Sequence, residues 1–425
     1  MMQKLFQPKQ KEFKPYRLIH GWVTNKQGSA LDEVLVSYMP GPGSYTGEDV
    51  VEINCHGNPS ILEAVLEAAM SLGARQAEPG EFTKRSFLNG KMDLTQAEAV
   101  LDMINAPTET GVFLARNKLK GHLSRKIEVL RISLQDLKEQ LCLAVDFPEE
   151  EVECLSRQEV ADRAEECQKE IDRMVSKYEQ GRIWTDGVFV VLTGKVNAGK
   201  SSLMNAVIGR ERAIVTEIPG TTRDYLEEAV NLGGLPVRLV DTAGLREAQD
   251  HVEVKGMEKG RELTLCADIL ILVLDSMQEP SSHDLIILNS TGPEKLIIVL
   301  NKWDLISSPP KWAEELEQTY PSVFRISAKQ GSGLTGVTDR IRQMALSGRS
   351  IKPEGALVPN LRQKSSLEKA SVELAELSRE AKNQVPYDLL AVRLDYACSE
   401  LDMVTGKITP DEVLNSIFDN FCIGK

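Results

Sequence analysis

The chain has 425 residues, 42% of them hydrophobic, and a formal net charge of −13 at pH 7. This length predicts two or three domains, and the negative charge argues against nonspecific coating of nucleic acid, although a local basic patch could still bind RNA. No apolar run approaches the ~20 residues of a membrane span, the basic start lacks the apolar segment of a signal peptide, and the seven cysteines form no Cys-x-x-Cys pair. We therefore expect a cytoplasmic protein with neither a zinc site nor a disulfide framework.

The N-terminal part of the chain predicts a small α+β domain over about residues 1–90. Short β-rich runs cover residues 17–24, 33–38 and 50–55, and turn-forming residues separate them. Residues 60–72 then show the three- and four-residue apolar spacing of a helix.

Amphipathic helices are predicted on both sides of a central segment. Their apolar residues recur at helical spacing in residues 97–104, 114–143, 158–178, 361–382 and 387–404.

The central segment, about residues 186–346, has apolar strand-like runs that end in polar motifs. Helical segments flank it at about 91–185 and 347–425, so we expect one α-helical bundle domain with an α/β domain inserted into it. Such an insertion is tolerated because the termini of a domain often lie close together. The predicted fold class is therefore multidomain, with an α+β domain, a helical bundle and an inserted α/β domain.

A phosphate-binding loop opens the inserted domain. The segment GKVNAGKS, from Gly194 to Ser201, follows the apolar run 188–192 and fits GxxxxGK[ST] in the strand-to-helix setting that this motif requires. Its glycines let backbone N–H groups wrap phosphates at a helix N-terminus. Lys200 is predicted to reach the outer phosphates and the Ser201 hydroxyl to bind Mg²⁺.

A guanine-reading motif follows another apolar run. NKWD, from Asn301 to Asp304, stands after residues 296–300, at the carboxyl end of a strand where doubly wound sheets bind ligands. The Asp304 carboxylate can accept two hydrogen bonds from guanine, which adenine cannot offer, so the motif predicts GTP. The segment SAK at 327–329 is typical of the companion loop that closes over the base.

The switch region lies between these two motifs. A strand ending in DTAG covers residues 239–244, where Asp241 is predicted to hold the Mg²⁺ shell and the Gly244 amide to sense the γ-phosphate. Thr221 and Thr222 are placed to supply a second hydroxyl to Mg²⁺. The four motifs in this order predict a P-loop GTPase.

Leu245 departs from the common GTPase pattern. Ras-type GTPases carry Gln after this motif to orient the attacking water, and a leucine cannot do so. Another group must therefore position the water. Acidic candidates close to the switch are Glu247, Asp250, Glu253 and Glu258, and their spacing alone does not choose among them.

Blocks outside the GTPase motifs resemble the MnmE (TrmE) family of tRNA modification GTPases. The most specific are SYTGEDVVEINCHG at 44–57, EPGEFTKRSFLNGKMDLTQAEAV at 78–100, AVDFPEEE at 144–151 and the terminal CIGK. Family members begin with about thirty further residues, which hold a first strand and a Gly-rich, Arg-bearing turn of the folate site. We therefore expect folate binding and N-terminal dimerisation to be the properties most affected in this chain.

The resemblance implies a function and a set of partners. It implies a homodimer that works with the FAD protein MnmG (GidA) in a heterotetramer and adds an aminomethyl or carboxymethylaminomethyl group to C5 of the wobble uridine in certain tRNAs. It also implies GTP, Mg²⁺, K⁺ and a tetrahydrofolate derivative (5-formyl- or 5,10-methylene-tetrahydrofolate) as cofactors.

The resemblance also assigns site residues. A K⁺ ion near the β–γ bridge would replace an arginine finger, since a monovalent cation offsets the charge that builds on the bridge oxygen. The family's water-orienting Glu falls on Glu253, and Cys422 lies near the folate pocket. The K⁺ ligands are Asn197, Thr216, Ile218 and Thr221; those of Mg²⁺ are Ser201 and Thr222; those of folate are Glu52, Lys91 and Lys425. The nucleotide contacts are Asn197, Ala198, Gly199, Lys200, Ser201, Ser202, Thr216, Glu217, Ile218, Pro219, Gly220, Thr221, Thr222, Asp241, Thr242, Ala243, Gly244, Asn301, Lys302, Trp303, Asp304, Ser327, Ala328 and Lys329.

Two other functions share part of this pattern. Ribosome-assembly GTPases of the Era or EngA type have the same core motifs, but they carry a KH-type RNA domain where this chain has helices and CIGK. A regulatory GTPase switch without a modification role would use its N-terminal domain only to bind partners.

Overall fold

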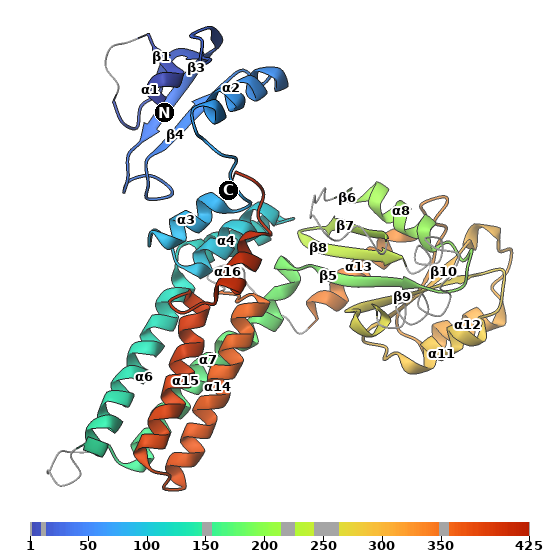
Figure 1. The fold of residues 1–425 in the computed structure, drawn as a ribbon. Coiled ribbons are helices and arrows are strands. Elements are labelled where there is room, and N and C mark those ends of the chain that lie inside the picture. The colour runs from blue at the N-terminus through green and yellow to red at the C-terminus, as the bar shows by residue number, and fades with distance from the viewer. Residues whose placement is uncertain are drawn as a thin grey trace, which may run out of the picture. The chain divides into compact units, whose positions relative to one another are not determined.

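The computed structural model describes residues 2–9, 14–146, 155–213, 226–241, 263–347 and 357–424 (Figure 1). The chain forms two compact units. One comprises residues 1–101, 124–132 and 398–425, and the other comprises residues 102–123 and 133–397.

The N-terminal region is a four-stranded antiparallel sheet with a helix on one face. The sheet order is β1-β2-β3-β4, and Val23, Val34 and Val36 point to the face that packs against Val65 and Ala68 of α2. This confirms the α+β character that the alternation of short strands and one helix predicts. The elements are α1 (Met2–Leu5), β1 (Phe6–Pro8), β2 (Ile19–Thr24), β3 (Ala30–Met39), β4 (Val50–Asn54) and α2 (Pro59–Ser71).

Short helices follow the N-terminal sheet and return at the C-terminus. Leu94 and Ala97 of α4 pack with Leu414 and Phe418 of α16 and with Phe421 in the tail. The first and last parts of the helical region therefore share a core. The helices are α3 (Glu81–Leu88), α4 (Leu94–Asn105), α5 (Glu109–Leu119) and α16 (Asp411–Phe418).

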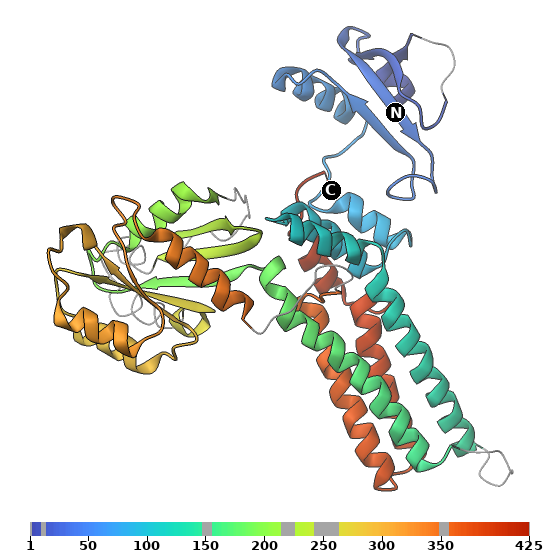
Figure 2. The same ribbon diagram turned by 180° about the vertical axis from the view of Figure 1, so that it is seen from behind.

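Four long helices form a bundle. In both views they run side by side (Figures 1 and 2). They are α6 (His122–Asp146), α7 (Arg157–Thr185), α14 (Leu361–Lys382) and α15 (Tyr387–Thr405). Polar contacts join each neighbouring pair: Arg163–Asp136 at 2.7 Å, Ser371–Asp172 at 2.6 Å, Arg393–Glu373 at 2.8 Å and Lys138–Asp395 at 2.5 Å.

The bundle explains the insertion of the α/β domain. Helices α7 and α14 lie next to each other, yet the whole α/β domain separates them in sequence. Because α7 ends at Thr185 and β5 begins at Val188, the chain passes almost directly from the bundle into the central sheet. None of the helices in the described ranges combines the length and apolar character needed to cross a membrane.

One predicted helix is wrong in the structure. The apolar periodicity of residues 114–143 predicts a single helix, but α5 ends at Leu119 and α6 begins at His122. Gly121 between them has φ of 70°, a left-handed conformation that ends helices and that glycine adopts without steric cost. The periodicity continues across the break because both helices pack apolar side chains inward.

A seven-stranded sheet forms the inserted domain. Its order is β11-β10-β9-β5-β8-β7-β6, in which β11 to β8 are parallel and the β7–β8 and β6–β7 pairs are antiparallel. The strands are β5 (Val188–Thr193), β6 (Arg212–Ala213), β7 (Leu226–Leu232), β8 (Leu235–Asp241), β9 (Ile269–Asp275), β10 (Leu296–Asn301) and β11 (Val323–Arg325).

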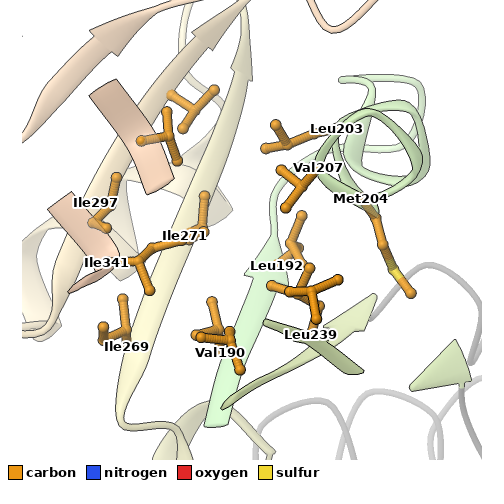
Figure 3. Packing of buried hydrophobic residues seen from close by; sticks show 14 of the residues in the cluster. Val190, Leu192, Leu203, Met204, Val207, Leu239, Ile269, Ile271, Ile297 and Ile341 are labelled. Carbon is orange, nitrogen blue, oxygen red and sulfur yellow. The ribbon is translucent and has the colours of Figure 1, made fainter. Parts of the chain in front are cut away.

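Helices cover both faces of this sheet. Figure 3 shows Val190 and Leu192 of β5 among side chains of α8, such as Leu203 and Val207, and Ile341 beside the neighbouring strands. A second apolar layer packs on the other face. The helices of the first layer are α8 (Lys200–Arg210) and α13 (Leu334–Leu346), and those of the second are α11 (Ser282–Ser290) and α12 (Lys311–Thr319).

The strand order places a switch point at β5. This strand comes first in the sheet's sequence, and its neighbours are β8 on one side and β9 on the other. The connections after β5 and after β8 therefore leave the sheet in opposite directions, which opens a crevice at the carboxyl ends of these strands. The GKVNAGKS loop begins at this edge.

Candidate nucleotide-binding site

The phosphate-binding loop has the backbone that its sequence predicts. It joins β5 to α8, with Gly199 as the residue that precedes the helix. Gly194, Asn197 and Gly199 have φ of 132°, 63° and 98°. Positive φ is costly for most residues but not for glycine, and asparagine tolerates it better than most others.

The two glycines also allow a close approach that larger residues would block. A Cβ at Gly194 would collide with the Val273 carbonyl oxygen on β9, and a Cβ at Gly199 would overlap the side-chain amide of Asn301. The loop can therefore lie against both neighbouring segments only because these positions lack side chains.

Lys200 and Ser201 occupy the first turn of α8. Lys200 is buried, and its Nζ donates to the carbonyl oxygens of Gly194 at 2.9 Å and Lys195 at 3.0 Å. The Ser201 hydroxyl donates to Oδ2 of Asp241 at 2.6 Å, and Asp241 is 1% exposed. Two predicted site residues that lie 40 positions apart are thus brought together.

The Ser201–Asp241 pair has the chemistry of a magnesium site. Mg²⁺ prefers hard oxygen ligands, and a hydroxyl and a carboxylate at a helix N-terminus supply them beside the phosphate loop. The residues present therefore fit the ion: Ser201 would bind it directly, and Asp241 would hold its hydration shell. Bound there, Mg²⁺ would neutralise charge on the outer phosphates.

Asn301 links three loops. It is 3% exposed, its Nδ2 donates to the Ala198 carbonyl at 2.8 Å, and its Oδ1 accepts from the Ala328 amide at 3.0 Å. One buried side chain therefore connects the phosphate loop, the NKWD motif and the SAK segment. Its donor and its acceptor are both satisfied, as burial of an amide requires.

Lys302 and Trp303 are held by neighbouring strands. Lys302 has φ of 63°, and its Nζ forms an ion pair with Asp275 at the end of β9, at 2.6 Å. The Trp303 amide donates to the Ile326 carbonyl at 3.0 Å, and the Arg325 guanidinium lies 4.5 Å from the Trp303 ring centroid. These contacts orient the short 3₁₀ turn Trp303–Leu305 that carries Asp304.

Asp304 is exposed at the surface of this turn. Its Oδ2 lies 3.5 Å from Nε2 of Gln330, which follows the SAK segment. Ser327 accepts a hydrogen bond from the Gln330 amide at 3.2 Å and forms an isolated β-bridge with Ser332. The structure thus places the carboxylate and the companion loop on the same side of the sheet.

A cavity of about 250 Å³ lies beside the phosphate loop and contains residues that the sequence motifs do not include. Asp284 is 2% exposed and caps α11 by accepting from Ser281, which the spacing S-x-x-D could have indicated. The partners Asp275 and Gln278 have no comparable sequence signal. The lining residues are Lys195–Ala198, Val273–Asp275, Gln278, Glu279, Asp284 and Lys302.

Part of the predicted site falls outside the described residues. These are Thr216, Glu217, Ile218, Pro219, Gly220, Thr221, Thr222, Thr242, Ala243, Gly244, Glu253 and Lys425.

The candidate folate residues lie in the N-terminal region. Glu52 is exposed on β4, and Lys91 donates through Nζ to the Pro42 carbonyl at 2.8 Å. The backbone of the tail approaches the segment before α3, where Pro79 and Ile423 form a β-bridge and the Gly80 amide donates to the Cys422 carbonyl at 3.4 Å. Within the described residues, no hydrogen bond joins Glu52 to Lys91 or to the tail.

Ion pairs fix the helix that precedes Lys91. Hydrogen bonds from Arg75 and Arg85 lower the pKa of Glu81 to about 2, so this carboxylate is charged at any physiological pH. Arg85 also pairs with Glu48 at 2.7 Å. Helix α3 is therefore tied to the SYTGED loop, and both belong to the sequence blocks that carry the family resemblance.

Comparisons with known proteins extend the match beyond the nucleotide site. A family model described as the MnmE helical domain matches residues 94–422, and one described as the GTP-binding protein TrmE N-terminus matches residues 1–91. The tRNA modification GTPase MnmE of Nitratidesulfovibrio vulgaris (strain Hildenborough) is 47% identical over 100% of this chain and 93% of that protein. The chain belongs to the MnmE family.

Further relatives agree with this assignment to the MnmE family. MnmE of Lawsonia intracellularis is 42% identical over 98% of this chain and 92% of that protein. Among solved structures, the G domain of the T. maritima FeoB iron transporter is 28% identical over 37% of this chain and 98% of that one, with a TM-score of 0.29. The chain is thus a GTPase of the tRNA modification class, and its N-terminal and helical regions separate it from Era-type proteins.

The Asn301 links predict how its loss affects the MnmE site. In Asn301→Ala, the Ala198 carbonyl and the Ala328 amide lose their partners inside the protein. We expect the free energy of unfolding to fall by about 2–3 kcal/mol and GTP affinity to weaken. Denaturant unfolding and nucleotide titration measure both. Asn289→Ala, at an exposed position of α11, is the control; equal losses in the two variants would contradict the linking role.

The exposed carboxylate of Asp304 predicts the base preference. In Asp304→Asn, the preference should move from GTP towards xanthosine triphosphate, because an amide can donate to the xanthine carbonyl where a carboxylate accepts from guanine. Competition binding of the two nucleotides measures the change, with Asp339→Asn on the exposed side of α13 as the control. A variant that keeps full guanine preference would show that Asp304 does not read the base.

Proposed function

We propose that this chain hydrolyses GTP while it modifies tRNA together with an FAD-dependent protein of the MnmG (GidA) type. The pair adds an aminomethyl or carboxymethylaminomethyl group to C5 of the wobble uridine in certain tRNAs. The observation that carries the proposal is the extent of the match, which covers the N-terminal and helical regions as well as the nucleotide site. GTPase motifs alone would support many other functions.

The N-terminal region, about residues 1–90, is proposed to dimerise and to bind a tetrahydrofolate derivative as the carbon donor. Glu52, Lys91 and Lys425 are its proposed ligands, with Cys422 near the pocket. Two contacts support this assignment: the tail approaches the segment before α3, and Lys91 contacts the loop at Pro42. Residues that are distant in sequence therefore meet in the region where the folate would bind.

Hydrolysis is proposed to depend on K⁺. Leu245 cannot orient water, so the charge that develops between the β- and γ-phosphates needs a cation from elsewhere. Asn197 supports this proposal because it lies in the phosphate loop with its backbone in the left-handed region. Thr216, Ile218 and Thr221 complete the proposed ion site, and Glu253 is the proposed water-positioning residue.

The tRNA nucleosides of a deletion strain test the function directly. Loss of the gene should remove the C5 modification from wobble uridine, and the unmutated gene should restore it. Lys200→Ala should not restore it, because Lys200 contacts the outer phosphates in the proposed site. Lys26→Ala, at an exposed turn, is the matched control. An unchanged nucleoside profile in the deletion strain would refute the proposed role.

The cation proposal predicts a difference between K⁺ and Na⁺. At equal ionic strength, GTP hydrolysis should be much faster in K⁺, because the site must match the size and coordination of the ion. Asn197→Ala should abolish this difference, and Asn205→Ala, on the exposed face of α8, should keep it. Steady-state phosphate release measures both.

Two results would contradict the cation mechanism. Equal rates in K⁺ and Na⁺ for the unmutated protein would exclude it. An Asn197→Ala variant with weakened nucleotide affinity but intact cation selectivity would show that Asn197 only shapes the loop.

A further inference from the structure

One short segment has a charge opposite to that of the whole chain. Residues 116–126, RNKLKGHLSRK, contain five Lys or Arg residues and His122 but no Asp or Glu, whereas the chain has a net charge of −13. The segment covers the end of α5, the turn at Gly121 and the start of α6. Positive charge is therefore concentrated at one place on an acidic protein.

One of the basic residues has a structural role. Lys118 is 2% exposed, and its Nζ pairs with Asp102 on α4 at 2.8 Å. A buried lysine without such a partner would lose its charge or destabilise the fold, so this pair explains the residue fully. The other basic side chains of the segment are exposed: Arg116, Lys120, His122, Arg125 and Lys126. We call these five residues the α5–α6 basic surface.

The local geometry keeps these side chains close along the chain. Arg116 and Lys120 are four residues apart, which places them on the same side of α5, where the Lys120 amide also donates to the Arg116 carbonyl. His122, Arg125 and Lys126 are related by three and four residues at the start of α6. Only Lys120 and Gly121 separate the two helices.

The charges at the start of α6 oppose its helix dipole. Acidic residues are favoured in the first turn of a helix, and α7 and α11 follow this rule with Glu159 and Asp284. Helix α6 has no acidic residue in its first turn and carries His122, Arg125 and Lys126 nearby. Helix stability therefore does not explain these cations, whereas an external anion would interact favourably with the side chains and with the helix terminus.

The first acidic residue after the segment does not cancel its charge. Glu128 forms an ion pair with Lys407 at 2.5 Å, so its carboxylate is already matched by another cation. The basic surface thus keeps a net positive charge.

We propose that the α5–α6 basic surface binds the phosphate backbone of the tRNA substrate. The proposal rests on the proposed function, since it names where the tRNA of that reaction is held. Five exposed cationic side chains over two helix ends suit a polyanion with regularly spaced phosphates better than a single small anion. Because the rest of the chain is acidic and repels RNA, this surface dominates the electrostatic part of binding.

The test is tRNA binding by a charge-reversal variant of the full chain. In Arg125→Glu/Lys126→Glu, we expect affinity for unmodified tRNA to fall about tenfold or more at low salt and the slope of log K against log[salt] to fall by about two. Fluorescence anisotropy with labelled tRNA over a salt series measures both. GTP hydrolysis without tRNA should stay unchanged.

Two further variants make the result specific. Lys26→Glu/Lys311→Glu changes the net charge equally at exposed positions elsewhere and should leave tRNA affinity within about twofold. Arg125→Gln/Lys126→Gln removes the charges without repulsion and should still reduce the salt slope by about two. Circular dichroism confirms that each variant is folded.

The possible failures are distinguishable. Unchanged tRNA affinity in both Arg125/Lys126 variants, with tight binding by the unmutated chain, would refute the surface and leave the proposed function intact. Equal losses in the Lys26/Lys311 control would also refute the surface. A deletion strain with normal wobble nucleosides would refute the proposed function itself. If the Arg125/Lys126 variants lost only an acidic protein partner, the surface would be a protein interface and the proposal would be wrong.

Discussion

The side-chain amide of Asn301 is the interaction on which the nucleotide site depends. It donates to the phosphate loop at Ala198 and accepts from Ala328, so three segments that bind different parts of a nucleotide meet at one buried group. Gly199 makes the arrangement possible, since a Cβ there would occupy the position of the amide. The spacing between the phosphate-binding and base-reading loops is therefore set by a hydrogen-bonded contact inside the protein, before any ligand contributes.

The sheet topology supports this contact. β5 lies between β8 and β9, so the phosphate loop leaves the sheet where the crevice opens. β8 ends at Asp241, whose carboxylate accepts from Ser201, and β9 ends at Asp275, which pairs with Lys302. Each neighbouring strand thus delivers one carboxylate to the edge of the crevice. The polar residues are rigid because the strands that carry them are buried on both faces.

The helical bundle explains how a nucleotide-binding domain can be inserted without disrupting the fold around it. α7 enters the inserted domain and α14 follows it, yet polar contacts such as Ser371–Asp172 and Ser378–Glu165 join the two helices directly. The Arg182 side chain near the end of α7 pairs with Asp268 before β9, and Asp268 also accepts from the Phe189 amide. The last turn of α7 is therefore anchored to the central sheet, which gives a physical connection between the bundle and the GTPase core.

The sequence by itself determined the elements whose signal is local. The phosphate loop, the strand before Asn301 and the alternating N-terminal strands follow from glycine positions, apolar runs and turn residues, and the structure contains them. The same local signals could not detect the break at Gly121, because apolar spacing continues through both α5 and α6. Only the tertiary structure showed that Asn301 links three loops, that Asp275 orients Lys302 and that Lys118 is neutralised by Asp102. These partners are far apart in sequence and carry no spacing rule, since strand order and helix packing alone decide which side chains meet.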